Sequence, residues 1–293
     1  MIPFARSSSP RLVTFAWRAT LLGAALAAGA AQGQVVVSSS GLSAGDITAA
    51  VNDYRGLLGA LNPNVAGSFA SGRREINWDG VPDMFSAPNN LPANFFNVNS
   101  PRGAVFTTPG SGLQVSANAV NPTATPVEFG NINPAYPGFF STFSPQKLFT
   151  AIGSNIVDVN FFVPGSTTAA LTRGFGAVFS DVDFANTTSI SFFDASNNLL
   201  DTFFAPSITG NETFSFLGVD YGSAVVSRVR ITNGDQVLAA ANVSQDLVVM
   251  DDFIYGEPLA IPEPEVYALM LAGIGVLAAK VRRRSRHGAT ANG

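Results

Sequence analysis

Carboxylates dominate the chemistry available to this chain of 293 residues, which has 20 Asp and Glu residues, no Cys and a single His, His287. The lack of Cys excludes disulfides, cysteine nucleophiles and thiolate metal sites. Because the one His stands so close to the C-terminal end, the sequence before it contains no Ser–His or Cys–His nucleophilic pair. Catalytic chemistry within residues 34–262 must therefore use carboxylates, Tyr, Arg or Lys147.

The first candidate site lies in the segment 73–83, where a Trp stands among polar and turn-forming residues. One interpretation is a glycan-binding site, in which Trp78 stacks on a sugar ring. Its hydrogen-bond acceptors would then be Asn77, Asp79 and Asp83. A second interpretation is that Trp78 is a buried core residue beside an Asp79-Gly80 turn. A third is that Asp79 and Asp83 together hold a cation.

The second candidate site consists of four aspartates in or next to two expected strands: Asp181, Asp183, Asp251 and Asp252. Alternate residues of a strand point to the same side, so Asp181 and Asp183 would repel each other unless a cation or donors lay between them. Structural calcium explains this spacing. The segment 249–256 is similar to the final strand of many jelly-roll carbohydrate-binding modules, and this resemblance implies that Asp251 or Asp252 ligates calcium. The alternative is that these aspartates face solvent or cap turns.

Catalytic carboxylates are harder to identify. A glycosidase needs two carboxyl groups roughly 5 to 9.5 Å apart in a cleft. Glu75, Glu128 and Glu212 are available, but their spacing identifies no pair. We therefore expect a non-catalytic protein, with a secreted carbohydrate-active hydrolase and a self-associating structural coat protein as alternatives.

Short β-strands are expected to position these side chains. Apolar and polar residues alternate in the segments 157–161, 189–192 and 225–231. Further strands are expected at 104–107, 113–117, 175–180, 199–204, 212–217 and 247–254, separated by Gly, Pro, Asn and Asp turns. Many short strands with no alternating helices predict an all-β fold, namely an antiparallel jelly-roll-like β-sandwich.

A short N-terminal helix is expected before the strands. Ser43 and Asp46 form a capping-box pattern, and Asn62-Pro63 is a stop signal. Apolar residues follow at helical spacing: Ile47, Val51, Tyr54, Leu58 and Leu61. We expect this apolar stripe to pack against the neighbouring sheet.

The N-terminal residues 1–33 read as a secretory signal peptide. Arg6 and Arg11 supply the basic region, an apolar stretch covers 21–31, and small residues close the segment. From residue 34 to 262 the chain has 18 acidic and 8 basic residues, hence a net charge of −10. Such a surface repels nucleic acid, so we expect no nucleic-acid partner.

The C-terminal residues form three successive elements. Pro262-Glu263-Pro264 is followed by the apolar stretch 266–279, expected to be a single transmembrane helix. A basic tail then contains Lys280, Arg282, Arg283, Arg284 and Arg286. The apolar stretch would be about 21 Å long as a helix, which is short for a bilayer. Basic residues keep the tail cytoplasmic, so the rest of the chain faces outward.

This ending resembles the PEP-CTERM sorting signal of Gram-negative bacteria, carried here by Pro262, Glu263, Pro264, the short helix and the basic tail. The resemblance implies handling by the secretion machinery and by a membrane-embedded exosortase. It also implies a precursor anchored in the inner membrane through the C-terminal helix, followed by a location at the cell surface or outside the cell. Proteins of this class occur in bacteria that make exopolysaccharide and live in biofilms.

The expected organisation is a signal peptide (1–33), a helical N-terminal segment (34–70), a β-sandwich ectodomain (71–258) and a sorting signal (259–293). The central stretch is similar to a recurring ectodomain of PEP-CTERM proteins that has no assigned activity. Together these patterns predict an exported, non-catalytic cell-surface or extracellular-matrix protein. Exopolysaccharide is the candidate ligand, and structural calcium is the one candidate cofactor, beside the alternative that the aspartates hold no metal.

Overall fold

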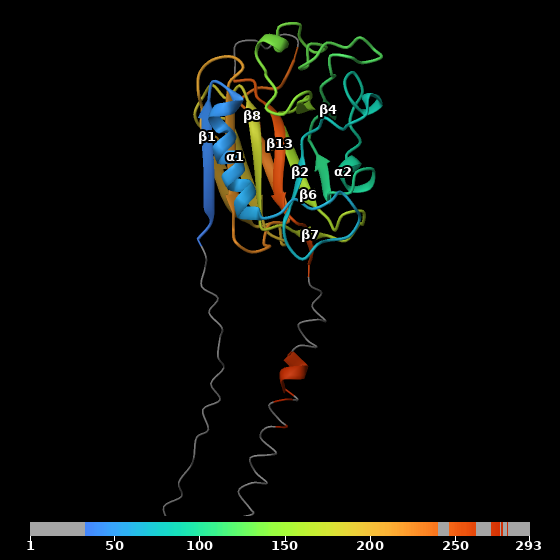
Figure 1. Cartoon of the computed structure of the whole chain (residues 1–293), viewed down its shortest axis with the longest axis vertical. Coiled ribbons are helices and arrows are strands. Elements are labelled where there is room, and N and C mark those ends of the chain that lie inside the picture. The colour runs from blue at the N-terminus through green and yellow to red at the C-terminus, as the bar shows by residue number, and fades with distance from the viewer. Residues whose placement is uncertain (1–32, 240–245, 262–270, 276, 278–279, 281–293) are drawn as a thin grey trace, which may run out of the picture. The chain divides into compact units, whose positions relative to one another are not determined.

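The computed structural model describes residues 33–239, 246–261, 271–275, 277 and 280, and its folded part is an all-β domain (Figure 1). The larger sheet has the order β1-β11-β8-β13-β5-β4, with β2 also paired to β13. Its strands are β1 (Val35–Gly41), β2 (Arg73–Ile76), β4 (Gly112–Val115), β5 (Phe149–Ile152), β8 (Gly174–Ser180), β11 (Phe214–Asp220) and β13 (Val249–Gly256). Every strand pairing within this sheet is antiparallel.

The second sheet has the order β10-β9-β12-β6-β3 and is also antiparallel. Its strands are β3 (Ala104–Thr107), β6 (Ile156–Phe161), β9 (Ser189–Phe193), β10 (Leu199–Phe204) and β12 (Arg228–Thr232). The short strands β7 (Ala170–Leu171) and β14 (Leu259–Ala260) pair separately. The helical elements are α1 (Ala44–Leu58), α2 (Phe95–Val98) and the 3₁₀ turns η1 (Asp83–Phe85) and η2 (Tyr136–Gly138). The expected antiparallel β-sandwich is confirmed.

The largest apolar core combines side chains from both sheets and is rich in aromatic rings. Phe253 of β13 lies edge-on to Trp78 and to Phe175, with ring centroids 5.1 Å apart in both pairs. Aromatic pairs at such angles add to the stability that burial of apolar area supplies. The many Phe residues are therefore largely explained by this core.

Helix α1 packs on the larger sheet through a second apolar core, as its stripe of apolar residues predicts. The capping box at Ser43 is present, and the helix ends before Gly59. Tyr54 lies against β11, where a Cβ at Gly218 would come within 2.8 Å of the tyrosine ring. The tyrosine hydroxyl donates a hydrogen bond to the Val219 carbonyl (2.9 Å). Glycine in the strand thus makes room for the helix.

Two features differ from the sequence-based expectation for the N-terminal segment. Val35–Gly41 is strand β1, paired with β11 along its whole length, rather than part of a helical segment. Leu61 lies beyond the end of α1 and is exposed, so it is not part of the buried stripe. Strand β5 was also not expected, because three of its four residues are buried and its sequence shows no alternation.

The start of the first strand, β1, and the last strand, β14, lie at the same end of the domain (Figure 1). Farther on, residues 271–275, 277 and 280 are helical, and Lys280 is exposed. None of the helices in the described parts of the chain has the length and hydrophobicity needed to cross a bilayer. Most of the expected transmembrane stretch lies outside the described residues, as do Pro262, Glu263, Pro264, Arg282, Arg283, Arg284 and Arg286.

Candidate functional site

Trp78 is buried, which contradicts the interpretation of this residue as an exposed sugar-stacking platform. Its indole stacks on Phe149 with ring centroids 4.0 Å apart, and its Nε1–H donates a hydrogen bond to the Asp251 carbonyl (2.7 Å). The side chain is 1% exposed, so neither face of the ring is open to a ligand. The backbone at Trp78 is left-handed (φ 66°), which is rare for a bulky residue. The interpretation of Trp78 as a core residue is confirmed.

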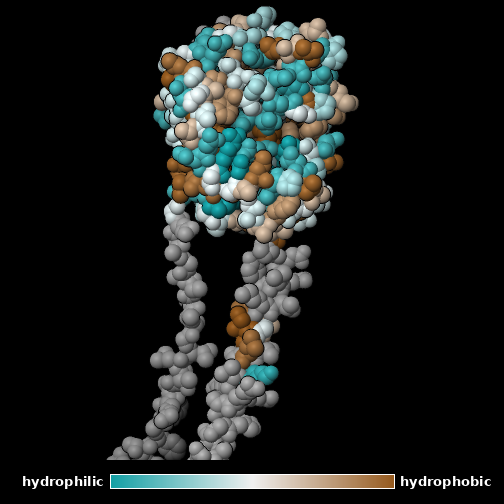
Figure 2. Space-filling view, viewed as in Figure 1, coloured by the Kyte–Doolittle hydropathy of each residue, from teal (hydrophilic) through white to brown (hydrophobic). Residues whose placement is uncertain are grey.

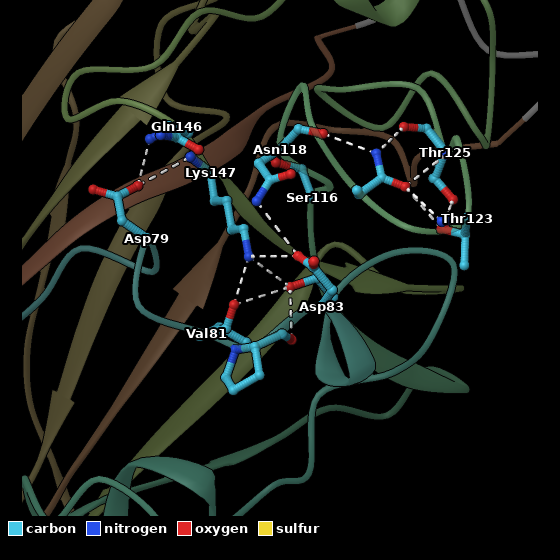
Figure 3. Close-up of polar contacts among 12 residues, drawn as sticks. Asp79, Val81, Asp83, Ser116, Asn118, Thr123, Thr125, Gln146 and Lys147 are labelled. Carbon is cyan, nitrogen blue, oxygen red and sulfur yellow. Dashed lines mark hydrogen bonds and ion pairs between the residues drawn. The ribbon is translucent and has the colours of Figure 1, made fainter.

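The neighbouring aspartates bind the protein's own groups (Figure 3). Asp79 Oδ1 accepts hydrogen bonds from the backbone N–H of Gln146 (2.5 Å) and of Lys147 (3.1 Å). Asp83 Oδ1 lies 3.6 Å from the Lys147 ammonium nitrogen. Asn77 is exposed but has no sugar-stacking partner in Trp78. The positive charge beside Asp83 is thus the Lys147 side chain, at the place where the third interpretation puts a cation.

The Lys147 side chain links the loop that contains Asp79 and Asp83 to the domain core. Its side chain is buried, and its ammonium group donates to the Val81 carbonyl (2.5 Å) and to Ser86 Oγ (3.1 Å). Asn118 Nδ2 is within 3.4 Å of Asp83 Oδ1 (Figure 3). A buried ammonium that is paired and hydrogen-bonded stabilises its surroundings rather than serving a ligand. This network therefore has a structural role.

Asp251 and Asp252 form a second, separate acidic pair at a bulge in β13, where the register with β8 shifts between Met250 and Phe253. Asp251 Oδ2 accepts the backbone N–H of Phe143 (2.6 Å), and Asp252 Oδ2 pairs with Arg55 (3.0 Å). Burial, and then the Asp252 charge, raise the pKa of Asp251 well above its usual range. These aspartates are satisfied by protein donors.

Asp181 and Asp183 lie near Asp246 rather than beside Asp251 and Asp252. The Asp183 backbone N–H donates to Asp246 Oδ1 (2.9 Å). Burial raises the pKa of Asp181 to about 8, and the charges of Asp183, Asp246 and Glu212 add to the shift. The expected set of four calcium ligands is thus divided between two places. Within the described residues, no three or more Asp, Glu, Cys or His side chains form a group that could hold a metal ion.

A cavity of about 420 Å³ opens at the end of α1. It is lined by residues 57–60, 62, 70–72, 173, 222–224, 257 and 259, and we call it the α1-end cleft. Its walls combine apolar side chains such as Leu57 and Leu259 with polar ones such as Asn62 and Arg173. Its volume falls in the range of roughly 300–1,000 Å³ that is typical of ligand-binding pockets.

Two charged residues that line the α1-end cleft, Glu257 and Arg173, each form an ion pair with a residue that is not part of its lining. Arg74 donates from Nε to Glu257 Oε2 (2.6 Å) and from Nη2 to Glu257 Oε1 (2.7 Å). Arg173 donates from Nε to Asp220 Oδ1 (2.8 Å) and from Nη2 to Asp220 Oδ2 (2.5 Å). Asn62 Nδ2 also donates to Glu257 Oε2 (2.8 Å). Both oxygens of each carboxylate, Glu257 and Asp220, therefore accept a hydrogen bond from a guanidinium group.

The sequence did not point to this cleft, because its residues are far apart along the chain. Asn62 and Glu257, which both line it, are 195 positions apart. The one available signal is positional: Asp220 ends β11 and Glu257 directly follows β13. Polar residues at strand ends often line binding sites formed by loops.

No family model matches the chain, and no curated protein matches it. Among solved structures it is similar to a glycoside hydrolase family 43 arabinoxylan arabinofuranohydrolase from Bacillus subtilis in complex with cellotetraose (13% identity, TM-score 0.26, covering 55% of this chain and 28% of that one). A mutant family 29 carbohydrate-binding module is 12% identical (TM-score 0.23, 55% and 98%). The enzymatically active domain of bacteriophage CBA120 tailspike protein 4 is 15% identical (TM-score 0.21, 62% and 22%).

Proposed function

We propose that this chain is an exported, non-catalytic cell-surface or extracellular-matrix protein of a Gram-negative bacterium, sorted by an exosortase, which binds exopolysaccharide in the α1-end cleft. The signal-peptide pattern of residues 1–33 and the PEP-CTERM-like ending support export and sorting. The net charge of −10 between residues 34 and 262 suits a soluble extracellular surface. We also propose that the sandwich has jelly-roll-like connectivity. The pairing of β2 with β13, which joins strands from near the two ends of the domain, supports this proposal.

The walls of the α1-end cleft suit a sugar chain. The guanidinium of Arg173 can donate hydrogen bonds to sugar hydroxyl groups, and the amide oxygen of Asn62 can accept them. Apolar side chains such as Leu57 and Leu259 can pack against the C–H faces of a sugar ring. Binding sites commonly combine an apolar lining with a few placed polar groups. The cleft offers both.

The observation that carries the non-catalytic assignment is the bidentate pairing of Glu257 with Arg74. A glycosidase needs one carboxyl group that donates a proton and another that acts as nucleophile or base. Glu257 lines the cleft, but two guanidinium N–H groups occupy its oxygens, and Arg173 occupies those of nearby Asp220. Carboxylates engaged in this way are poorly suited to either role, so the cleft favours binding over hydrolysis.

The test uses protein expressed from the full-length reading frame and incubated with insoluble exopolysaccharide from the producing bacterium. We expect the protein to sediment with the polysaccharide and to release no new reducing ends. Release of reducing ends would favour the secreted hydrolase instead. Absence of retention, with concentration-dependent light scattering, would favour the self-associating coat protein.

On the face shown in Figure 2, polar and apolar residues are intermixed, without one dominant apolar patch.

A further inference from the structure

Acidic residues gather at the end of the sandwich opposite the α1-end cleft. Asp181 directly follows β8, and Asp246 lies three residues before β13. Because Ser180 of β8 pairs with Val249 of β13, the register of the sheet brings these two aspartates to the same end. Figure 1 shows that β13 starts at the end of the domain away from the described termini. This arrangement concentrates negative charge in one place.

The aspartates at this end are held close to one another by hydrogen bonds. Asp246 Oδ1 accepts the Asp183 N–H (2.9 Å), and Asp246 Oδ2 accepts a hydrogen bond from the Thr187 hydroxyl. Asp183 Oδ1 accepts the Gly210 N–H (2.8 Å). These contacts hold the backbone of the acidic loops in place. None of the ion pairs formed by the described residues includes Asp181, Asp183, Asp246 or Glu212.

Asp181 stands out within this group. Its side chain is 4% exposed, and its buried Oδ1 has no hydrogen-bond partner in the described structure. Buried carboxylates are normally paired or hydrogen-bonded, because desolvating an unpaired charge is costly. The backbone at Asp181 is also left-handed (φ 72°). An isolated carboxylate in such surroundings points to a positively charged ligand.

Asn233 adds a neutral oxygen donor at the same end of the domain. Both polar atoms of its buried amide lack hydrogen-bond partners in the described structure. The next residue, Gly234, packs so closely that a Cβ there would come within 2.0 Å of the Asp246 carbonyl oxygen. Two unpartnered side chains, one acidic and one amide, therefore adjoin the same acidic loops.

We infer that this end of the sandwich binds a divalent cation, with calcium as the best fit, through the carboxylates of Asp181 and Asp183. All the available ligands are oxygens, which calcium prefers to nitrogen or sulfur. No three carboxylates here form a closed cage, so main-chain oxygens and water complete the coordination shell. Asp246 and Glu212 add negative charge nearby, which favours a dication over a monovalent ion. The site lies apart from the proposed glycan cleft.

The test uses the full-length protein after EDTA treatment and dialysis, with calcium chloride as the only added probe. The variants are Asp181→Asn and Asp183→Asn. Asp53→Asn is the control, because it removes the same charge from an exposed position on α1. Isothermal titration calorimetry measures binding, and thermal unfolding measures the effect on stability.

We expect saturating calcium to raise the Tm of the wild type and of Asp53→Asn by the same amount. Asp181→Asn should lose this response, yet have a higher Tm than the wild type without calcium, because the substitution removes a buried carboxyl group whose Oδ1 has no hydrogen-bond partner. This opposite sign distinguishes a lost ligand from a misfolded variant. Asp183→Asn should weaken calcium binding by about tenfold or more. An unchanged calcium response in Asp181→Asn, or no response of the wild type, would overturn the inference.

Discussion

Arg74 forms a bidentate ion pair with Glu257, which lines the α1-end cleft, and both side chains are at most 1% exposed. The same guanidinium donates to the Pro63 carbonyl, so the pair also fastens the loop between α1 and β2 to the end of β13. The shape of the cleft thus depends on one buried ion pair. Its energetic importance can be measured.

Replacing Arg74 with Met should lower the free energy of unfolding by about 3–5 kcal/mol, because it leaves the Glu257 carboxylate buried without its partner. Urea denaturation measures the change. Arg230→Met is the matched control, since its pair with Asp158 is much more exposed and should be worth at most about 1 kcal/mol. Equal losses in the two variants would show that the Arg74–Glu257 pair is not a strong constraint.

Trp78→Ala should destabilise the fold by about 3–5 kcal/mol, because it opens a large cavity among the core rings. The folded fraction should still bind exopolysaccharide like the wild type. Trp78 is the only Trp beyond the predicted signal peptide, so intrinsic fluorescence of the processed protein reports on it alone. We expect an emission maximum at short wavelength that polysaccharide does not shift. A ligand-induced shift, or binding lost with Trp78, would restore the sugar-platform hypothesis.

The free energy of unfolding should fall as the pH rises from about 4 towards neutrality. Burial raises the pKa of Asp251 well above its usual range, so over this interval the folded state binds more protons than the unfolded state. Asp251→Asn should flatten the profile, measured by urea denaturation at several pH values. Asp53→Asn, on the exposed side of α1, should keep the wild-type slope. An identical slope in both variants would contradict the role given to Asp251.

The sorting proposal predicts the mass of the mature protein. Protein recovered from the producing bacterium should lack residues 1–33 and the basic tail from Lys280 to Arg286, as the two terminal patterns predict. Intact-mass spectrometry gives this result directly. Recovery of a chain that still carries Arg282, Arg283, Arg284 and Arg286 would show that exosortase processing does not occur.

Alternation in the sequence predicted part of the fold well, because one face of these strands is buried and the other is polar. The alternating segments 157–161 and 189–192 coincide with β6 and β9, and α1 begins after Ser43 as its capping box indicates. Strands β8, β11 and β13 are buried on both faces and were still predicted from the turns that bound them, whereas β5, which has only four residues and no alternation, was not. The N-terminal β1 was taken as part of a helical segment, although it joins the sheet beside β11.

The candidate sites were predicted less well, because spacing along the chain does not report which way a side chain points. Trp78 and Asp79 are neighbours, yet the indole enters the core while the carboxylate binds backbone N–H groups of residues 146 and 147. The α1-end cleft joins residues more than 180 positions apart, which no local pattern can reveal. Only the carboxylates at Asp181 and Asp183 remain in the proposed cation site.

The central claim is that exopolysaccharide binds in the α1-end cleft, and blocking the cleft tests it most directly. Ser223 is an exposed residue of the cleft wall, whereas Ser196 is an exposed turn residue outside it. Calorimetric titration of both Ser→Trp variants with solubilised exopolysaccharide should show wild-type affinity for Ser196→Trp. Ser223→Trp should raise the Kd by about tenfold or more, equivalent to about 1.4 kcal/mol. Wild-type affinity in Ser223→Trp would contradict the assignment of the cleft.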